Sequence, residues 1–381
     1  MVWAEIDLDA IAHNTRQLRR ITNPGSQLLV AVKANGYGHG AIEVAQQVLH
    51  NGATALGVAR IEEGIQLREA GIDAPILVFG YTDSMLAEQL MAFNLIPTVF
   101  SFEMANSLSQ AAVLSGKRIK VHLKVDTGMG RIGLTPDCTE ACLTGMETRN
   151  KSIAEAQAIA ALSGLELEGI FTHFAAADRV DKTNAREQFA LFLEFIEQLR
   201  IKGLEIPIRH VANSAAIIHM PETHLDMVRA GISAYGLYPF KEIDQNRIDL
   251  QPAMTLKTRI IQLKSVSSHF KVSYGSTYET MEPTIVATVP IGYADGLSRR
   301  LSSRGHMLVH GERAPILGRI CMDFTMLDVG KITGVTQNDE VVIFGKQKDE
   351  SITVDEIAKE LDTIHYEIVS IISSRVPRIY R

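Results

Sequence analysis

Residues 28–40 read LLVAVKANGYGHG, an apolar run that ends in a lysine and is followed by alternating glycines. A short, uninterrupted apolar run is typical of a strand that is buried on both faces, and the glycines indicate a loop directly after it. We therefore expect a buried strand over Leu28–Lys33, with Lys33 at its carboxyl end.

Similar runs recur along the next two hundred residues, separated by segments with helical spacing such as 189–199. Eight strands that alternate with helices predict an α/β fold, a (β/α)8 TIM barrel. A doubly wound parallel sheet with the same alternation is the competing architecture. The seven further expected strands are Thr54–Ala59, Pro75–Phe79, Ile96–Val99, Ile119–Val125, Leu167–Thr172, Ile208–Val211 and Asp226–Arg229.

The pattern changes after Tyr238-Pro239. Period-2 segments broken by Gly and Pro predict a mostly β C-terminal domain. The sequence thus predicts two domains, a barrel over residues 1–240 and a β domain over residues 241–381. The expected strands of the second are Met254–Lys264, Ile285–Pro290, Met307–His310, Ala314–Ile320, Thr325–Val329 and Glu340–Phe344, with a helix over Thr353–Leu361.

The bulk composition excludes several classes of protein. The net charge of −6 comes from scattered acids and bases, so we expect no nucleic acid partner. No apolar stretch reaches the roughly 18 residues of a membrane span, and the acidic N-terminus does not resemble a signal peptide. The chain has 3 cysteines, too few and odd in number for a disulfide framework. We expect a cytoplasmic protein without a membrane partner.

Lys33 is the first candidate for chemistry, because active sites of barrels lie at the carboxyl ends of the strands. Burial disfavours an ammonium and lowers its pKa, and only a neutral amine attacks an aldehyde to form a Schiff base. The alternative is a lysine that forms an ion pair across the barrel mouth. The glycines after Lys33 could hold a phosphate, but their spacing alone is weak support.

The stretch AVKANGYGHG at 31–40 resembles the pyridoxal phosphate (PLP) attachment signature of alanine racemases. Further blocks match the same family in order along the whole chain. They are KVDTGMGR (124–131), THFA (172–175), ANSAA (212–216), VRAGI (228–232), VSYGSTY (272–278), IGYADG (291–296), GRICMD (318–323) and RVPR (375–378). The resemblance implies a PLP-binding barrel followed by a β domain, in a homodimer with shared active sites.

The resemblance also implies a two-base mechanism. Lys33, which carries the cofactor, acts on the D side of the substrate, and Tyr274 of the partner subunit acts on the L side. His173 and Arg229 match the groups that the family uses to lower the pKa of that tyrosine, and Arg229 also faces the pyridine nitrogen. Because a guanidinium keeps its protons, the ring remains a weaker electron sink, which suppresses transamination and decarboxylation.

Other contacts are carried over from the same resemblance. The phosphate contacts match Tyr37, Ser214, Gly231 and Ile232, although Asn213-Ser214 alone could be a helix cap. The substrate carboxylate matches Arg131 and the Met322 backbone. Lys124 matches a lysine that is carbamylated in many members, with an ordinary Lys124–Asp126 ion pair as the alternative. The entrance and inner gate of the site match Tyr278, Tyr293 and Asp323.

The chain departs from the family pattern in two places. Ser374 stands where many relatives have a tyrosine before RVPR, which predicts a roomier substrate pocket and appreciable serine racemisation. The segment Thr135–Ser163 is longer than expected and contains Cys138 and Cys142. No histidine lies nearby to complete a metal site, so we expect no metal.

Alanine racemisation, which supplies D-alanine for peptidoglycan, is therefore the leading functional hypothesis. A broader alanine/serine racemase is the alternative of the same class. A non-catalytic PLP-binding carrier protein is the alternative of another class, but a carrier needs no opposing base. A barrel-type PLP decarboxylase is a third alternative, but the glycine-rich phosphate loop expected of it is not evident.

Overall fold

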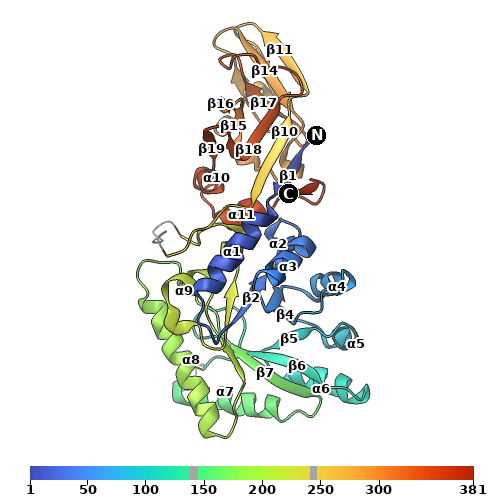
Figure 1. Ribbon diagram of the computed structural model, residues 1–381, viewed down its shortest axis with the longest axis vertical. Coiled ribbons are helices and arrows are strands. Elements are labelled where there is room, and N and C mark those ends of the chain that lie inside the picture. The colour runs from blue at the N-terminus through green and yellow to red at the C-terminus, as the bar shows by residue number, and fades with distance from the viewer. Residues whose placement is uncertain (137–144, 241–246) are drawn as a thin grey trace. The chain divides into compact units, whose positions relative to one another are not determined.

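The computed structural model describes residues 1–136, 145–240 and 247–381 (Figure 1). These residues form two compact units. One unit consists of Ala10–Gly36 and Ala41–Gln251, and the other of Met1–Asp9, Tyr37–Gly40 and Pro252–Arg381. Cys138 and Cys142 lie outside the described residues.

The first unit is a closed barrel of eight parallel strands, each hydrogen-bonded to the next, with the last paired to the first. Each strand overlaps one of the eight expected from the sequence, so the predicted barrel is confirmed and the doubly wound alternative is excluded. The strands are β2 (Gln27–Ala31), β3 (Ala55–Val58), β4 (Ile76–Val78), β5 (Ile96–Val99), β6 (Ile119–Lys124), β7 (Leu165–Phe171), β8 (Ile208–His210) and β9 (Met227–Ala230).

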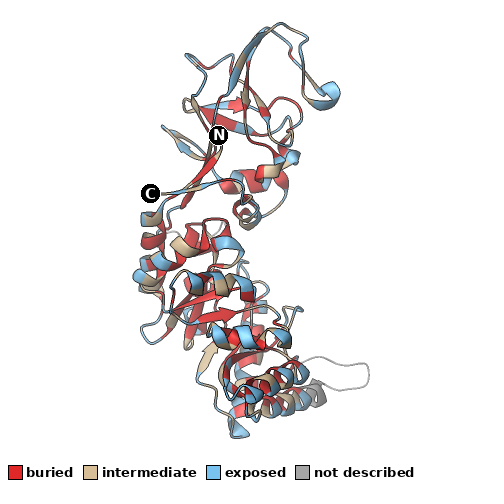
Figure 2. Cartoon of the chain, turned by 90° about the vertical axis from the view of Figure 1, so that its right-hand side faces the viewer, coloured by how far each residue is buried: buried red, intermediate tan, exposed pale blue. Residues whose placement is uncertain are grey.

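Helices connect successive strands of the barrel (Figure 1). Their buried residues recur at helical spacing, as in α8, where Phe192, Phe195 and Leu199 are buried while residues 193, 194 and 197 are exposed. The strands are buried almost throughout, whereas the helices are buried along one side (Figure 2). The helices are α1 (Leu8–Ile21), α3 (Ala41–His50), α4 (Ile61–Glu69), α5 (Ala87–Ala92), α6 (Phe102–Leu114), α7 (Gly145–Ala160), α8 (Thr183–Ile201) and α9 (Ser214–His219).

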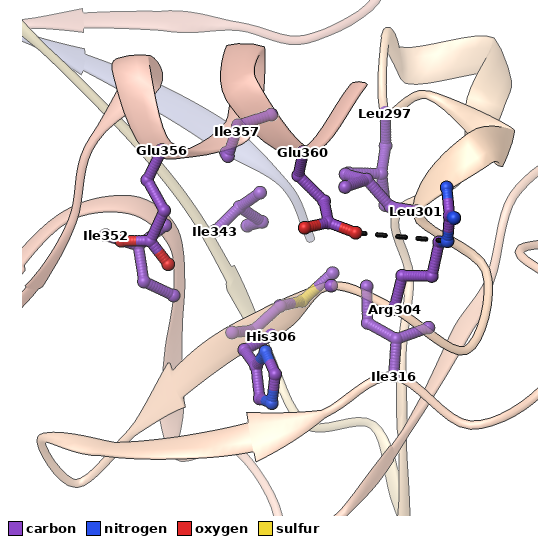
Figure 3. A pocket seen from close by; sticks show the side chains of 12 residues that line it. Leu297, Leu301, Arg304, His306, Ile316, Ile343, Ile352, Glu356, Ile357 and Glu360 are labelled. Carbon is purple, nitrogen blue, oxygen red and sulfur yellow. Dashed lines mark ion pairs between the residues drawn. The ribbon is translucent and has the colours of Figure 1, made fainter. Parts of the chain in front are cut away.

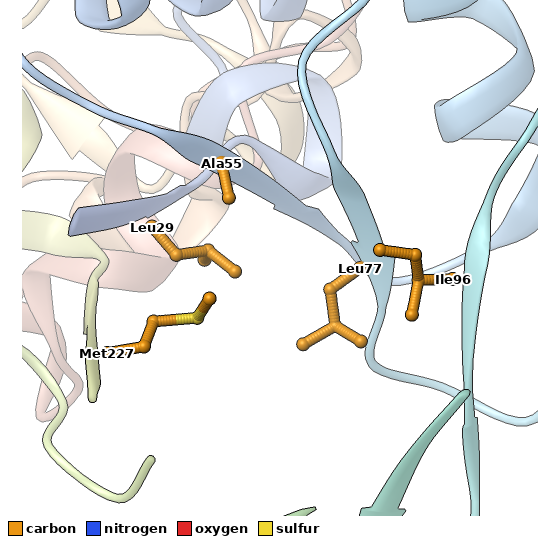
Figure 4. Close-up of a cluster of buried hydrophobic side chains, with 5 residues drawn as sticks. All are labelled: Leu29, Ala55, Leu77, Ile96 and Met227. Carbon is orange, nitrogen blue, oxygen red and sulfur yellow. The ribbon is translucent and has the colours of Figure 1, made fainter. Parts of the chain in front are cut away.

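Apolar side chains from five neighbouring strands meet inside the barrel (Figure 4). Side chains that pair in register point to the same side of a sheet, so a closed barrel collects every second side chain in its interior. The interior is therefore a packed core, and inward-facing polar side chains are exceptions that need an explanation. The apolar cluster consists of Leu29, Ala55, Leu77, Ile96 and Met227.

The second unit is mostly β, as predicted. Its main sheet has the order β16-β15-β18-β10-β1-β20, β19 pairs with β18, and a second sheet has the order β11-β14-β17. Its elements are β1 (Trp3–Ile6), β10 (Met254–Arg259), β11 (Gln262–Val266), β12 (Lys271–Val272), β13 (Tyr278–Glu279), β14 (Thr284–Val289), β15 (His306–Val309), β16 (Glu312–Pro315), β17 (Thr325–Asp328), β18 (Glu340–Gln347), β19 (Glu350–Ile352), β20 (Arg378–Tyr380), α10 (Val354–Leu361) and α11 (His365–Ser370).

Two expected strands of this unit differ from the structure. The expected strand Met254–Lys264 is divided between β10 and β11, which belong to different sheets. The expected strand Ala314–Ile320 ends at Pro315, and Gly318 follows with a left-handed φ of 66°. The first segment alternates apolar and polar residues from Met254 to Lys257, and this local pattern does not reveal where a strand leaves its sheet. The second segment is mostly apolar and contains Pro315 and Gly318, so its composition does not fix the end of the strand.

The two compact units of the structure are not separated at one boundary near residue 240. The first residues belong to the β-rich unit because β1 pairs antiparallel with β10 and parallel with β20. Residues 247–251 belong to the barrel unit, where the Gln251 amide donates to Asn14 Oδ1 at 2.8 Å. Within the described part of the chain, no helix is long and apolar enough to cross a membrane.

Candidate functional site

Seven of the residues singled out from the sequence lie at one edge of the barrel. The strands are parallel in a closed ring, so their carboxyl ends meet at the same edge. Lys33 follows β2, Lys124 ends β6, His173 follows β7, Ser214 follows β8, and Arg229, Gly231 and Ile232 lie at the end of β9.

The loop after Lys33 is a left-handed turn. Ala34, Asn35, Gly36 and Tyr37 have φ values of 53°, 53°, 60° and 49°. A left-handed conformation costs roughly 1–2 kcal/mol for each residue other than glycine. Backbone strain of this kind occurs mainly at functional sites, where surrounding contacts hold it in place. The glycine-rich stretch therefore serves here to turn the chain sharply next to Lys33.

Glu63 of α4 holds this turn, a role that the sequence analysis missed. Its Oε1 accepts a hydrogen bond from the Ala34 amide at 2.6 Å. Its Oε2 accepts from the amides of Ala59 and Arg60 at 2.7 and 3.1 Å. A glutamate in the first turn of a helix is a common capping residue, so the sequence around Glu63 indicates only a cap for α4 and not a contact with the turn after Lys33.

Burial lowers the pKa of the Lys33 amine, and the positive charge of Arg131 lowers it further. The negative charge of Glu63 opposes both effects but does not cancel them. No ion pair of Lys33 within 4 Å occurs among the described residues, so the mouth-spanning ion pair is absent. The amine is thus more readily neutral, and therefore nucleophilic, than an ordinary lysine.

Arg229 is buried and held from several directions. Its Nη2 donates to the carbonyls of Thr172 and Val211 at 2.8 and 3.1 Å and faces His173 Nδ1 at 3.3 Å. Its Nη1 donates to His210 Nδ1 at 2.8 Å. Burial lowers the pKa of Arg229 to about 9, which leaves it charged at neutral pH. The barrel thus holds a fixed cation at its rim.

Both histidines beside Arg229 are neutral. Burial, followed by the charge of Arg229, lowers the pKa of His173 and of His210 well below the usual value. An arginine can only donate, so Nδ1 of His173 must be the acceptor. The proton of the neutral His173 ring is therefore on Nε2, where it can be donated to another group.

Lys124 is almost fully buried, with 2% of its surface exposed. Its Nζ donates to the Val125 carbonyl at 2.6 Å. Asp126 Oδ1 accepts from the amides of Gly128, Met129 and Gly130, and Oδ2 accepts from the Arg131 amide at 2.8 Å. Asp126 thus shapes the loop that carries Arg131, and no Lys124–Asp126 ion pair within 4 Å is present among the described side chains.

Burial lowers the pKa of Lys124 to about 7, although the charge of Asp126 opposes this. A base whose pKa is lowered by folding binds fewer protons in the folded than in the unfolded protein. Its contribution to stability therefore increases as the pH rises from about 7 towards its unfolded value. Relative to Lys124→Met, the wild-type free energy of unfolding should rise by about 2 kcal/mol between about pH 7 and about pH 9.

Urea unfolding in buffers free of carbon dioxide would measure this difference, with the exposed Lys117→Met variant as the control. The control should be parallel to the wild type across the same range. A constant difference between wild type and Lys124→Met would show that the buried amine does not titrate near neutral pH.

The loops after β8 and β9 are joined through Ser214. Its Oγ accepts from the amides of Gly231 and Ser233 at 2.8 and 3.4 Å. Asn213, not Ser214, caps α9, because its Oδ1 accepts from the Ala216 amide at 3.1 Å. The Ser233 hydroxyl is buried beside this junction without a hydrogen-bond partner. A buried hydroxyl of this kind suits a ligand with acceptor oxygens.

Tyr274 lies in a strained loop of the β-rich unit, and 68% of its surface is exposed. Ser273 has φ 66° and ψ −177°, a conformation found almost only for glycine, and Ser276 has a φ of 48°. The Ser273 hydroxyl donates to the Arg319 carbonyl. The loop therefore presents an exposed tyrosine at a defined place on this unit.

The other predicted residues of the β-rich unit lie on neighbouring loops. The amide of Tyr293 donates to the Cys321 carbonyl at 3.1 Å, next to Met322. Arg375 forms ion pairs with Asp323 and Asp295 at 2.7 and 3.0 Å. Tyr293, Met322 and Ser374 are exposed, and Tyr278 is half-buried.

Tyr37 is buried within the β-rich unit, where its ring centroid lies 6.4 Å from that of Tyr366. Burial raises the pKa of Tyr37 to about 12, so its hydroxyl remains protonated. A protonated phenol donates a hydrogen bond, which is compatible with the expected phosphate contact.

A separate hollow of about 50 Å³ lies in the β-rich unit (Figure 3). It is lined mainly by apolar side chains such as Leu297 and Ile357, and the Arg304–Glu360 ion pair lies across it at 3.9 Å. No residue predicted from the sequence for the site lines it. The structure also contains no group of three or more possible metal ligands among the residues it describes.

Comparison with known proteins identifies the same family over both units. The chain matches the model of the alanine racemase N-terminal domain over residues 6–239 and that of the C-terminal domain over residues 253–380. It is 54% identical to an alanine racemase of Desulfosudis oleivorans, over 99% of this chain and 96% of the relative. It is 48% identical to one of Methanococcus maripaludis, over 100% of this chain and 98% of the relative.

Solved structures give the same result. The alanine racemase of Clostridium difficile 630 is 39% identical with a TM-score of 0.92, over 100% of this chain and 95% of that chain. The alanine racemase of Bacillus anthracis with bound L-Ala-P is 38% identical with a TM-score of 0.89, over the same shares.

Proposed function

The chain belongs to the alanine racemase family, and from this we propose that it interconverts L- and D-alanine with pyridoxal phosphate and two bases. The observation that carries the proposal is the presence of two groups at one barrel edge. These are the Lys33 amine with its lowered pKa and the buried Arg229 cation. The D-alanine formed would serve peptidoglycan synthesis.

The residues at this edge fit pyridoxal phosphate. Lys33 suits its aldehyde, Arg229 suits its pyridine nitrogen, and the buried Ser233 hydroxyl beside Ser214 suits its phosphate. When bound, the cofactor supplies an electron-withdrawing ring that acidifies the substrate Cα–H. Gly231, Ile232 and Tyr37 are the further phosphate contacts of the proposal.

Arg229 limits the reaction to proton transfer. Its guanidinium would donate to the pyridine nitrogen of the bound cofactor and keep its own protons, since even a pKa of about 9 leaves it charged at neutral pH. The network of carbonyl and imidazole acceptors around it stabilises the charged form. Electron withdrawal is thereby kept moderate, which disfavours transamination and decarboxylation.

The two bases act on opposite faces of the substrate. Lys33 Nζ removes or returns the Cα proton on the D side, and Tyr274 of the partner subunit does so on the L side. A base on each face keeps both within reach of the same carbon. His173 supports the second base, because its Nε2 proton can be donated to an ionised phenol oxygen.

The exposed residues of the β-rich unit support a homodimer. Tyr274, Tyr293 and Met322 expose 68%, 42% and 52% of their surfaces, and they lie on adjoining loops. Large apolar and aromatic residues that are exposed together mark interaction surfaces. In the proposal these loops, with Tyr278 and Asp323, complete the active site of a second copy.

Arg131 and the Met322 backbone of the partner subunit hold the substrate carboxylate. The Asp126 contacts to the loop amides fix the backbone from which Arg131 extends. Lys124 is proposed as a carbamylation site, because its lowered pKa makes the neutral amine available to carbon dioxide. A carbamate would place a negative charge near Arg131 and orient its guanidinium.

Hydrogen exchange tests the proposal directly. Purified protein with its cofactor is incubated with L-alanine in deuterated water, and loss of optical rotation is followed together with Cα deuteration. Racemisation by two bases predicts that both signals change together. Binding of the cofactor without either change would instead favour a PLP-binding carrier protein.

A second substrate is favoured by Ser374, an exposed residue whose side chain is much smaller than tyrosine. We expect appreciable racemisation of L-serine, because a pocket rejects one added hydroxyl only weakly unless it is closed sterically. Ser374→Tyr should lower kcat/KM for L-serine relative to L-alanine by roughly tenfold. Ser374→Ala is the control and should keep the wild-type ratio. Undetectable L-serine activity beside robust L-alanine activity would exclude this second substrate.

A further inference from the structure

His210 accepts a hydrogen bond from Arg229, and two further polar side chains, His122 and Glu168, continue from it without a part in the mechanism above. Arg229 Nη1 lies 2.8 Å from His210 Nδ1, and His210 Nε2 lies 2.8 Å from His122 Nδ1. His122 Nε2 then faces Glu168 Oε2 at 3.6 Å, slightly longer than a direct hydrogen bond. Lys120 Nζ contacts the other Glu168 oxygen at 2.6 Å. The contacts form a continuous series from the rim to Glu168.

The hydrogen-bond donors and acceptors of this series can be assigned in only one way. An arginine can only donate, so His210 Nδ1 must accept and its proton must be on Nε2. His210 Nε2 then donates to His122 Nδ1, which places the His122 proton on Nε2. That proton points to Glu168 Oε2, and among the described residues the buried His122 Nε2 has no other partner for a hydrogen bond or an ion pair.

The backbone is arranged to permit these contacts. The β6–β7 register shifts between Val121 and His122, so that Glu168 is an extra residue of β7 without a partner on β6. Bulges of this kind redirect a side chain. A Cβ at Gly169 would come within 2.5 Å of the His122 ring, so that only glycine leaves room for the imidazole.

The His210 ring is also held in place. It stacks on Phe171 with centroids 4.7 Å apart and an interplanar angle of 9°. His210 pairs in register with Met227, a member of the apolar cluster, so its ring lies inside the barrel. Burying an imidazole among apolar side chains is costly unless the ring is hydrogen-bonded. The contacts of the series therefore stabilise the two buried rings.

We propose that Glu168 is a positioning residue that fixes the tautomers of His122 and His210 and thereby keeps Arg229 aimed at the cofactor nitrogen. The proposal rests on the proposed role of Arg229. Without an acceptor at Glu168, His122 can move its proton to Nδ1, and His210 must then carry its proton on Nδ1. The Nδ1–H of His210 would then face an N–H of Arg229. Arg229 would lose this hydrogen-bond acceptor, and its guanidinium would move.

The charge states agree with this arrangement. The contact with His122, and also Lys120, lowers the pKa of Glu168 to about 2, although burial opposes this. Burial lowers the pKa of His122 and, more strongly, that of His210. At neutral pH the series therefore consists of one carboxylate, two neutral imidazoles and one guanidinium.

Nitrogen-15 NMR of the holoenzyme labelled at histidine tests the proposal, with His210→Gln and His122→Asn used to assign the signals. In the wild type, both rings should carry their proton on Nε2 at neutral pH. This measurement needs no variant of Glu168. A proton on Nδ1 of either ring would overturn the proposal.

The matched variants are Glu168→Leu and Glu166→Leu. Glu166 is exposed on the same strand, and its charge also acts on Lys120, but it does not contact His122. Glu168→Leu should produce a mixture of tautomers in His122 and His210. It should also lower kcat about tenfold at unchanged KM, which is the lower end of the losses measured for outer hydrogen-bond partners at metal sites. Glu166→Leu should change neither, and Glu168→Gln, which retains an acceptor, should restore the wild-type tautomers.

Unchanged tautomers in Glu168→Leu would overturn the proposal even if kcat fell. Failure of the proposed function has a different signature. In that case the tautomers would respond to Glu168 as described, but the wild-type holoenzyme would not racemise alanine.

Discussion

Lys33→Ala should lose almost all racemase activity, by a factor of about 10²–10⁴. It should also lose the visible absorbance of the cofactor bound covalently to the lysine amine. Lys33 is the only described lysine whose backbone leads into the left-handed turn held by Glu63. Its amine also has a lowered pKa, so no neighbouring lysine can replace it in both roles. Steady-state assays in both directions and absorbance spectra measure the two effects.

Lys117→Ala is the control for this variant, because Lys117 is exposed in the loop before β6. It should keep wild-type activity and absorbance. Thermal unfolding shows whether Lys33→Ala is folded, and we expect it to be, since removing a half-buried amine leaves no large cavity. Full activity in a folded Lys33→Ala protein would contradict the proposed mechanism.

Tyr274→Phe should produce an asymmetric loss. Removal of the phenol oxygen eliminates the base on the L side but leaves Lys33 on the D side. Racemisation should therefore fall by about 10²–10⁴, and exchange of the Cα hydrogen of L-alanine should fall with it. Exchange of the Cα hydrogen of D-alanine should persist. Mass spectrometry of each enantiomer after incubation in deuterated water separates the two.

Tyr81→Phe is the matched control, since Tyr81 is exposed to 62% and Tyr274 to 68%. It should leave both exchange rates unchanged. Equal loss of exchange from both enantiomers in Tyr274→Phe would argue against a base specific to the L side.

A mixture of the two inactive variants tests whether the active sites are shared. When Lys33→Ala and Tyr274→Phe subunits exchange, each mixed dimer contains one site with both native bases. Random exchange should therefore restore roughly a quarter of the wild-type activity. No restoration after demonstrated subunit exchange would mean that each chain supplies its own tyrosine.

Much of the fold could be predicted from the sequence because its signals are local. Most barrel strands appear as short, mainly apolar runs, and the change after Tyr238 to period-2 segments marks the β-rich unit. The break between β10 and β11 could not be predicted. Both sides of Ile260 have strand-like composition, and the separation depends on which sheet each half joins.

The positions of the rim residues could also be predicted from the sequence, since each lies at or near the carboxyl end of an expected strand. The residues that contact them could not be predicted. Glu63 reads as a helix cap, yet its second oxygen holds the turn after Lys33. Asp126 reads as a partner for Lys124, yet its oxygens are taken by loop amides.

The alternation of strands and helices, the carboxyl-end positions of Lys33, Lys124 and Arg229, and the resemblance of the motif blocks to one family all follow from the linear order of residues. Which polar side chains contact one another depends on the folded structure. His122 and His210 are 88 residues apart and come together because the barrel closes and a bulge shifts Glu168 towards them. Apolar periodicity reports the average burial of neighbouring residues, whereas these contacts depend on strand register between distant segments.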